Sequence, residues 1–323
     1  MVEVCVTWDV GKPFLDGYSR FFKEKIPVII KKNEIHRKKE EILNSEIIVR
    51  GVFIPEFLKS NKLRLVHSMI KSTRNLPIDK LKERKIRVTK TIGAWGISAA
   101  EYVLMTILML SRDIKQFLNR RVEKEQWSLN PESDVVKNKI IAILGNGEIG
   151  ISVARYCKVL GMKTIVVGKK RKNEKLRFVD KFYEPSKILE AVEKADYIVV
   201  ALPYAKDTID SVNKTIFDSL RKKPFLINIS RGGIVNERDM KFALREEKIR
   251  GVFLDVFQNE PPKYDDNLFR LKNVYFTPHI AGVTKYTEFL MGIVAGKAIK
   301  DFLDGKLSTQ SIQKDGLGYE VVI

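Results

Sequence analysis

The sequence predicts an α/β protein of two domains, one of them built on a doubly wound parallel sheet. The chain has 323 residues, about twice the ~150 residues of an average domain. Short apolar segments, of the length of buried strands, alternate along it with segments of helical spacing, and such alternation produces parallel sheets with helices on their faces. Residues 139–170 add a strand, a glycine triplet, a helix and a second strand in succession, which is the repeating unit of such a sheet.

The first domain is expected to be a small α/β unit that begins the chain. Expected strands are residues 2–8, 27–30, 47–50, 63–69 and 86–89, and expected helices are residues 18–23, 37–43, 55–59 and 77–83. The run Lys71-Ser72-Thr73-Arg74 follows one of these strands. Because open α/β sheets present ligand-binding loops at this edge, the run is a candidate site segment.

Glycine-containing segments at 93–96 and 282–285 are the predicted boundaries between the domains. A long helix capped by Ser98 and running to about Leu118 should follow the first boundary. A helix that returns to the first domain should follow the second. The first domain then comprises residues 1–93 and 287–323, and the second comprises residues 94–286.

The glycines at 145, 147 and 150 have the spacing G-x-G-x-x-G and follow an apolar strand at 140–144. In this context Gly145 permits a tight turn, Gly147 lets a pyrophosphate approach the backbone, and Gly150 lets the next helix pack against the strand. The pyrophosphate would bind the N–H groups of the helix that begins near Ile149 and stops at Gly161. The alternative is an ordinary strand-to-helix turn. We expect a Rossmann-type dinucleotide site.

The rest of the second domain continues the alternation of strands and helices. Further strands are expected at residues 164–167, 197–201, 226–229, 251–255 and 274–276, and further helices at residues 188–193, 216–220 and 237–245. Together with the glycine unit they complete the doubly wound sheet.

Composition and charge narrow the function classes. The chain is 44% hydrophobic, and its net charge is +19. It shows no signal-peptide pattern, and its longest apolar run, 102–110, is shorter than the ~20 residues that cross a bilayer, so we expect a cytoplasmic protein. The basic residues form scattered clusters without a zinc-finger, helix-turn-helix or RNA-binding signature, which favours a solvated basic surface over nucleic-acid binding. Cys5 and Cys157 lie in apolar elements and should be reduced. No metal site is expected.

Three later segments place Arg231, Glu260 and His279 just after predicted strands. Singly, Arg231 could be a surface ion-pair partner, Glu260 a loop acid, and His279 a hydrogen-bonded residue of a strand end. At one sheet edge the three suit a definite task. An Arg binds a carboxylate in a fork, a His transfers a proton, and a Glu orients and charges the imidazole.

These segments carry a resemblance to a known family. The matching motifs are Ala100-Glu101, GNGEIG at 145–150, Ala201-Leu202-Pro203 with Asp207-Thr208, INISRGGIVNE at 227–237, LDVFQNEP at 254–261 and TPHIAG at 277–282. In this order and spacing, between about Ile86 and Phe302, the chain resembles the D-2-hydroxyacid dehydrogenases. That group includes D-glycerate, hydroxypyruvate, glyoxylate, D-lactate and phosphoglycerate dehydrogenases.

The resemblance implies a Rossmann-type cofactor domain, a smaller flavodoxin-like substrate domain and a catalytic set. His279 would be the acid/base, Glu260 its partner, and Arg231 the anchor of a 2-oxo acid that accepts a hydride from a reduced nicotinamide. Asp255 would help to hold the nicotinamide carboxamide. A homodimer built through the cofactor domain and the helix around Glu101 is also implied. The expected cofactor-binding residues are Gly145, Gly147, Glu148, Ile149, Gly150, Gly168, Lys169, Lys170, Leu202, Pro203, Ile229, Asp255 and Gly282.

One departure from the family concerns the choice of cofactor. NAD-dependent members carry an acidic residue at the end of the second strand, where it binds the ribose hydroxyls. Here that position is Gly168, and Lys169-Lys170-Arg171-Lys172 follow. Without the carboxylate, and with four cations, the site should prefer the 2′-phosphate of NADP, with NAD as the alternative. The alternative interpretation is a basic surface turn that happens to lack an acid.

Another departure lies in the substrate loop. Family members place a glycine where Ser72 stands, so that backbone N–H groups meet the substrate carboxylate. Either this loop has a different conformation, or Lys71 and Arg74 add positive charge for a more anionic substrate. We assign Lys71 and Ser72 to the substrate site together with Arg231 and His279. Asn236 also replaces an acid, a change that we expect to be minor.

The leading hypothesis is an NADP-linked reductase of glyoxylate or hydroxypyruvate. Within the same family, D-lactate, phosphoglycerate or phosphite are alternative substrates. From another class, a non-catalytic nucleotide-sensing protein is the alternative, because some relatives of this fold act as transcriptional corepressors. The intact set of Arg231, Glu260 and His279 favours the enzyme, whereas the charge of +19 weakly favours a polyanion partner.

Overall fold

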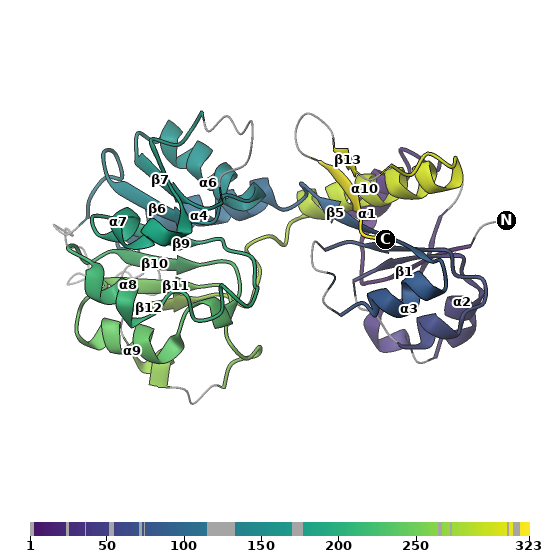
Figure 1. Ribbon diagram of the computed structural model, residues 1–323, viewed down its shortest axis with the longest axis horizontal. Coiled ribbons are helices and arrows are strands. Elements are labelled where there is room, and N and C mark those ends of the chain that lie inside the picture. The colour runs from purple at the N-terminus through teal and green to yellow at the C-terminus, as the bar shows by residue number, and fades with distance from the viewer. Residues whose placement is uncertain are drawn as a thin grey trace, which may run out of the picture. The chain divides into compact units, whose positions relative to one another are not determined.

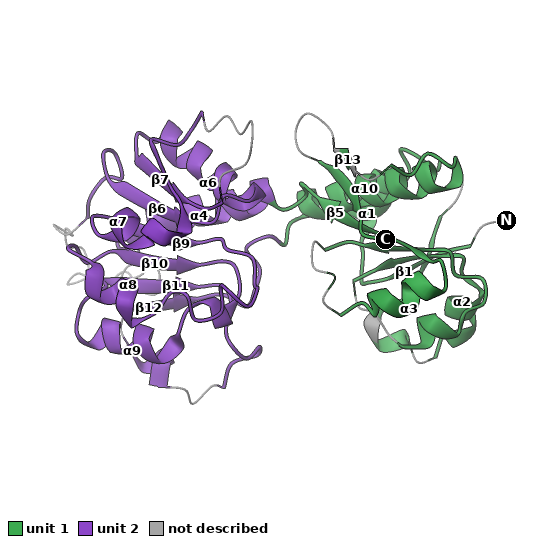
Figure 2. Ribbon diagram, viewed as in Figure 1, with its two compact units in different colours: residues 1–95, 283–323 green, residues 96–282 purple. Residues whose placement is uncertain are grey.

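The computed structural model contains two compact units (Figures 1 and 2). Unit 1 comprises residues 1–95 and 283–323, and unit 2 comprises residues 96–282. The boundaries expected from sequence, after residues 93 and 286, differ from these by two and four residues. The described residues are 3–23, 26–35, 37–51, 55–70, 73, 75–114, 133–169, 177–263, 267–271, 273–308, 310–312 and 317–323.

Unit 1 contains a seven-stranded sheet in the order β13-β14-β5-β4-β3-β1-β2. The strands are β1 (Val4–Thr7), β2 (Val28–Ile29), β3 (Ile47–Arg50), β4 (Leu65–Ser68), β5 (Arg87–Ile92), β13 (Gln310–Ile312) and β14 (Gly318–Val321). The five strands from β5 to β2 are parallel and have the flavodoxin-like order. The C-terminal pair, β13 and β14, extends the sheet in the antiparallel sense.

Helices cover both faces of this sheet because its strand residues alternate between two cores. Its helices are α1 (Lys12–Tyr18), α2 (Lys39–Asn44), α3 (Ile78–Glu83) and α10 (Lys285–Leu303), with short 3₁₀ helices η1 (Lys32–Glu34) and η2 (Pro55–Lys59). Ile47 and Val49 pack in the core beneath α1 and α10, whereas Ile48 packs in the core beneath α2 and α3. The central strand β3 is therefore apolar on both sides, as expected for a covered parallel sheet.

Unit 2 contains a second seven-stranded sheet, all parallel, in the order β12-β11-β10-β9-β6-β7-β8. The strands are β6 (Ile140–Leu144), β7 (Lys163–Val167), β8 (Lys181–Tyr183), β9 (Tyr197–Val200), β10 (Phe225–Asn228), β11 (Gly251–Leu254) and β12 (Val274–Phe276). The sheet extends from β6 to both edges, through β7 to β8 on one side and through β9, β10 and β11 to β12 on the other. This is the Rossmann order. The predicted fold class is confirmed.

Two cores again lie on the faces of the sheet. The helices of unit 2 are α4 (Gly96–Ser111), α6 (Glu148–Val159), α7 (Ile188–Val192), α8 (Lys214–Ser219) and α9 (Glu237–Arg245), with 3₁₀ helices η4 (Pro185–Lys187), η5 (Gly232–Ile234) and η6 (Asn267–Arg270). Ile141 and Ile143 pack with α4 and α6, while Ala142 and Leu144 pack with residues of α7, α8 and α9. Among the described residues, no helix combines the length and apolarity needed to cross a membrane.

The helix expected at residues 18–23 is wrong, because the structure places α1 at Lys12–Tyr18. Gly17 lies inside α1, at the crossing of this helix with α10. A Cβ on Gly17 would lie 2.2 Å from the Phe289 carbonyl oxygen, and a Cβ on Gly292 would lie 2.0 Å from that of Phe14. The two glycines therefore let the two backbones approach closely, and this tertiary contact outweighs their low helix propensity.

The expected cap of the long helix is also wrong. Helix α4 begins at Gly96, so Ser98 lies in its first turn and is buried. The Gly96 N–H donates instead to the Glu148 carboxylate, at the start of α6. A side chain from another helix thus satisfies a terminal donor of α4. The expected end near Leu118 lies outside the described residues, and strands β8, β13 and β14 were missed.

His67, in the middle of the unit 1 sheet, is fully buried between two threonines of β5. Its Nδ1 lies 2.8 Å from Thr89 Oγ1, and its Nε2 lies 3.1 Å from Thr91 Oγ1. A neutral imidazole satisfies both contacts, with one ring nitrogen as donor and the other as acceptor. Burial lowers the pKa of His67 to about 3.

This histidine should make the stability of unit 1 depend on pH. Between about pH 3 and the ordinary His pKa of about 6.5, the unfolded chain binds a proton that the folded chain does not, so the free energy of unfolding should rise with increasing pH, by up to ~1.4 kcal/mol per pH unit. In His67→Asn this slope should be smaller by up to ~1.4 kcal/mol per pH unit, which is the contribution of one proton. Urea unfolding from pH 4.5 to 7.5 measures it, and an unchanged slope in the variant would contradict the assignment.

Candidate active site

Arg231, Glu260 and His279 follow three neighbouring strands of unit 2. In the register of the sheet, Asn228 of β10 pairs with Leu254 of β11, and Leu254 pairs with Phe276 of β12. The three strands therefore end level at their carboxyl edge, and the segments that carry the three side chains all leave from that edge. This is the edge at which open α/β sheets bind ligands.

His279 and Glu260 form a direct pair. His279 Nδ1 lies 2.7 Å from Glu260 Oε2, and the two side chains are 44% and 37% exposed. The other carboxylate oxygen, Oε1, accepts a hydrogen bond of 3.0 Å from the Phe257 N–H. Because one oxygen is held by the backbone, the carboxylate has a fixed direction, and it orients the imidazole in turn. The backbone of His279 is left-handed, with φ of 57°.

The Asp255 carboxylate, buried directly after β11, holds the segment that carries His279. Its Oδ1 accepts from Thr277 Oγ1 and from the Ile280 N–H, both at 2.7 Å, and its Oδ2 accepts from the Ala281 N–H at 2.9 Å. These three bonds bracket His279 on both sides in sequence. Buried carboxylates need several donors to offset their desolvation, and this one finds them in the segment that it shapes.

Tyr102 of α4 extends this network. Because Thr277 donates its hydroxyl proton to Asp255, it can only accept from the Tyr102 hydroxyl, with which it forms a hydrogen bond. Burial raises the pKa of Tyr102 to about 12, so its hydroxyl stays a neutral donor. Sequence reasoning missed Tyr102 and Thr277, and Asp255 was assigned only to the cofactor. The single signal was that Asp255 ends an apolar strand.

Arg231 stands exposed after β10, on a turn that Asn228 organises. Asn228 accepts from the Ser230 N–H at 3.1 Å and donates to the Arg231 carbonyl at 3.2 Å. Arg231 Nη1 donates to the Ser230 carbonyl at 2.6 Å. Within the described part of the chain, no carboxylate forms an ion pair with Arg231, so the surface ion-pair alternative has no partner there. Gly232 allows close contact with the Glu260 segment, since a Cβ at that position would lie 1.9 Å from the Phe257 carbonyl carbon.

The glycine triplet has the geometry of a phosphate cradle. Gly145 has φ of 120°, and a Cβ there would lie 2.4 Å from the Ala201 carbonyl oxygen. A Cβ on Gly150 would lie 2.0 Å from the Gly145 carbonyl oxygen, whereas one on Gly147 would meet nothing within 4 Å. Gly147 is also the N-cap of α6 and carries no side chain that could bond the first-turn N–H groups. The residues present therefore fit a dinucleotide pyrophosphate.

The remaining residues expected at the cofactor lie along the same edge or just behind it. Glu148 accepts a hydrogen bond from the Gly96 N–H. Ile149, in the first turn of α6, packs against the core on that face of the sheet, and Ile229 is buried after β10. Pro203 is exposed, and its neighbour Leu202 accepts a hydrogen bond from the Ser230 hydroxyl through its carbonyl. Gly282 ends unit 2. Lys170 lies outside the described residues.

At the end of β7, Gly168 is covered by Asn146 of the glycine triplet. Asn146 Nδ2 donates to the Lys169 carbonyl at 2.9 Å. The exposed Lys169 ammonium lies 3.4 Å from Asp207, a distance and exposure at which an ion pair is weak. Because residue 168 is glycine, this position offers no carboxylate to a ribose.

The expected substrate residues Lys71 and Ser72, and Arg74 with them, lie outside the described residues. At the carboxyl end of β3, Arg50 is only 2% exposed. Its Nη2 donates to Ser68 Oγ at 3.5 Å, and within the described residues its Nε and Nη1 have no hydrogen-bond partner. Burial lowers the pKa of Arg50 to about 10, so it is still a cation at neutral pH. Sequence reasoning missed it, although a charge that ends the apolar run 47–49 was a signal.

In the described residues, no three His, Cys, Asp or Glu side chains are placed to hold a metal ion. Cys5 and Cys157 are buried free thiols, and burial raises the pKa of each to about 12. Asn236 caps α9 by accepting the Asp239 N–H at 3.0 Å, a role that asparagine and aspartate fill equally well.

Comparison with known sequences gives matches over most of the chain. A sequence model described as "D-isomer specific 2-hydroxyacid dehydrogenase, NAD binding domain" matches residues 104–281. A 2-hydroxyacid dehydrogenase of Staphylococcus saprophyticus is 32% identical over 74% of this chain and 76% of that protein. A glyoxylate reductase of Thermococcus litoralis is 29% identical over 79% of this chain and 78% of that protein. A D-3-phosphoglycerate dehydrogenase of Archaeoglobus fulgidus is 30% identical over 72% of this chain, and the match spans only 44% of that longer protein.

Solved structures give the same fold. The crystal structure of the TT0316 protein from Thermus thermophilus aligns with a TM-score of 0.79, over 94% of this chain and 98% of that one, at 22% identity. At this level of identity the likeness concerns the fold alone.

Proposed function

The chain belongs to the D-isomer specific 2-hydroxyacid dehydrogenase family, and we propose that it transfers a hydride between NADP(H) and a small D-2-hydroxy acid/2-oxo acid pair. Glyoxylate and hydroxypyruvate are the first candidate substrates, which the likeness to the Thermococcus glyoxylate reductase supports. The observation that carries the proposal is the His279–Glu260 pair, bonded at 2.7 Å at the same sheet edge as the exposed Arg231.

In the proposed reaction, the reduced nicotinamide supplies a hydride when it is bound. His279 donates the proton to the substrate oxygen as negative charge develops there. Because Nδ1 is engaged by Glu260, Nε2 is the ring atom that donates this proton. The Glu260 carboxylate stabilises the imidazolium by its opposite charge. In the reverse direction the neutral imidazole accepts the proton from the hydroxy acid.

Arg231 is proposed to anchor the substrate carboxylate. Its guanidinium offers a planar fork of donors that matches two carboxylate oxygens. The bond from Nη1 to the Ser230 carbonyl sets the direction of that fork, and the Asn228 side chain stiffens the turn beneath it. Lys71 and Ser72 are proposed as further substrate-binding residues.

We also propose a cytoplasmic homodimer. Helix α4 leaves Ile97, Met105 and Leu108 each about two-fifths exposed on one face, with the exposed Glu101 between Ile97 and Met105. Exposed apolar side chains gathered on one face are often covered by a partner, and a second copy would bury these in an isologous contact. The two free buried thiols agree with a reducing compartment.

The proton-transfer role of His279 gives a direct prediction. His279→Ala should lower the turnover of 2-oxo acid reduction about 10²–10⁴-fold, the usual contribution of a general acid. Its affinity for NADPH, measured by calorimetry, should change little. Glu260→Gln should cause a smaller loss, because the imidazole keeps a hydrogen-bond partner but loses the charge. Near-normal turnover in His279→Ala would remove His279 from the chemistry.

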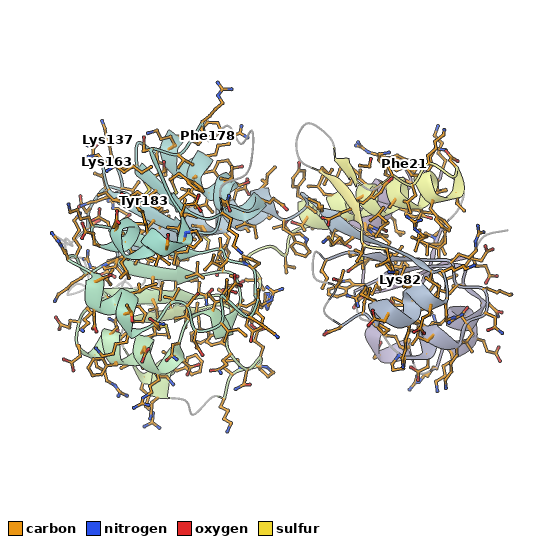
Figure 3. All side chains as sticks on the ribbon, in the orientation of Figure 1. Phe21, Lys82, Lys137, Lys163, Phe178 and Tyr183 are labelled. Atoms are coloured by element: carbon orange, nitrogen blue, oxygen red, sulfur yellow. The ribbon has the colours of Figure 1, made fainter. Side chains whose placement is uncertain are left out.

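The preference for NADP gives another prediction. Lys169→Gln should lower kcat/KM for NADPH at least about tenfold, the loss of one charge-assisted hydrogen bond, and should leave that for NADH nearly unchanged. Lys163→Gln is the matched control, since the exposed Lys163, labelled in Figure 3, starts the same strand β7 that Lys169 follows. Equal losses in the two variants would mean that the effect comes from the net charge alone. A wild-type preference for NADH would contradict the proposed cofactor.

A second substrate class is favoured by Arg50, whose Nε and Nη1 have no hydrogen-bond partner among the described residues. Arg50 ends β3, and the strand order reverses between β3 and its neighbour β1. Open sheets bind ligands at such a switch point. A buried cation at this place suits a substrate with a second anionic group, as in phosphoglycerate.

Steady-state rates on hydroxypyruvate and on its 3-phosphate ester test this alternative. If it holds, the wild type prefers the ester, and Arg50→Met lowers kcat/KM for the ester at least about tenfold more than for hydroxypyruvate, because only the ester loses a charged hydrogen bond. Arg50→Lys, which keeps the charge, should lie between. Equal effects on the two substrates would leave Arg50 with a structural role and favour the smaller substrates.

A further inference from the structure

We propose that Asn146, inside the glycine triplet, is a determinant of cofactor selectivity because it bars any side chain from the end of β7. The inference rests on the proposed function, since it concerns how the same dinucleotide site distinguishes a ribose 2′-phosphate from a 2′-hydroxyl. It assigns the distinction to a pair of positions, 146 and 168, on two different segments.

The space next to Gly168 is filled by the Asn146 side chain. A Cβ added to Gly168 would lie 2.3 Å from Asn146 Oδ1, 2.5 Å from its Cγ and 2.9 Å from its Cβ. All three distances are shorter than real Cβ contacts. An alanine at 168 would therefore already collide with Asn146, and an aspartate, which must leave through the same Cβ, would collide in the same way.

Asn146 cannot easily move aside, because both of its ends are fixed. Its Nδ2 is bonded to the Lys169 carbonyl at 2.9 Å. Its backbone lies between Gly145, which is held against the Ala201 carbonyl, and Gly147, the N-cap of α6. Gly150 contacts the Gly145 carbonyl from the helix side. The collision is thus with an anchored group rather than with the free end of a flexible side chain.

Two consequences for the cofactor follow from this contact. No acid at position 168 can reach the ribose hydroxyls while Asn146 is present, and such an acid is the usual device for NAD. The bond to the Lys169 carbonyl also fixes the main chain from which the basic residues that follow β7 begin. Asn146 therefore excludes the carboxylate and holds the backbone of Lys169 at the same time.

A double-mutant cycle tests the contact without the cofactor. Gly168→Ala should lower the Tm by about 4 °C or more, as expected for an overpacked contact in a chain of this size. When Gly168→Ala is added to the Asn146→Gly variant, it should lower the Tm by much less than it does in the wild type. Additive effects would show that the side chain of Asn146 does not restrict position 168, and would overturn the inference.

Calorimetric binding of NADPH, NADH and 2′,5′-ADP then tests selectivity. Asn146→Gly/Gly168→Asp should bind NADH at least about tenfold more tightly than wild type, one added charged hydrogen bond, and should lose 2′,5′-ADP. Gly168→Asp alone should not gain NADH. An equal gain in the single and double variants, or none in the double, overturns the inference but leaves the proposed function intact. A wild type that binds none of the three overturns the proposed function, while the Tm cycle still reports on the Asn146 contact.

Discussion

The buried carboxylate of Asp255 is the interaction on which the candidate site depends. It lies where β11 ends and accepts three hydrogen bonds from the segment after β12. These bonds connect the two neighbouring strands beyond the point where their backbone pairing ends. His279, between these donors in sequence, has a left-handed conformation, which is uncommon for non-glycine residues. Tyr102 ties the same network to α4. If His279 is the proton donor, as proposed, a side chain placed in this way by packing and hydrogen bonds loses little entropy when a substrate arrives.

Close backbone contacts set the second constraint, and glycine is the residue that permits them. Gly150 lets α6 approach the turn at Gly145, and Gly232 brings the Arg231 turn against the Glu260 segment. In unit 1, Gly17 and Gly292 do the same for α1 and α10. The contacts at Gly150 and Gly232 bring together the segments that form the candidate site, so its side chains depend on positions that carry no functional group themselves.

The sequence was sufficient for the parts of the fold that local pattern dictates. The apolar strands of both sheets, the glycine unit and the helix at 237–245 were predicted because periodicity and turn residues act over a few positions. Helix α1, the start of α4 and the strands β13 and β14 were not, since each depends on a partner distant in the chain. The same holds for the site. Arg231, Glu260 and His279 were predicted from their positions after strands, whereas the hydrogen bonds of Tyr102, the burial of Arg50 and the contact of Asn146 with Gly168 are seen only in the structure.

The central claim is that this sheet edge transfers a hydride to a 2-oxo acid and supplies its proton. The most direct measurement follows the hydride itself. NADPH deuterated at C4 of the nicotinamide is incubated with the protein and glyoxylate or hydroxypyruvate, and the product is analysed by mass spectrometry and chiral chromatography. The account predicts deuterium at C2 of the hydroxy acid and, from hydroxypyruvate, the D isomer alone. An L or racemic product, or a C2 hydrogen drawn from water, would contradict it.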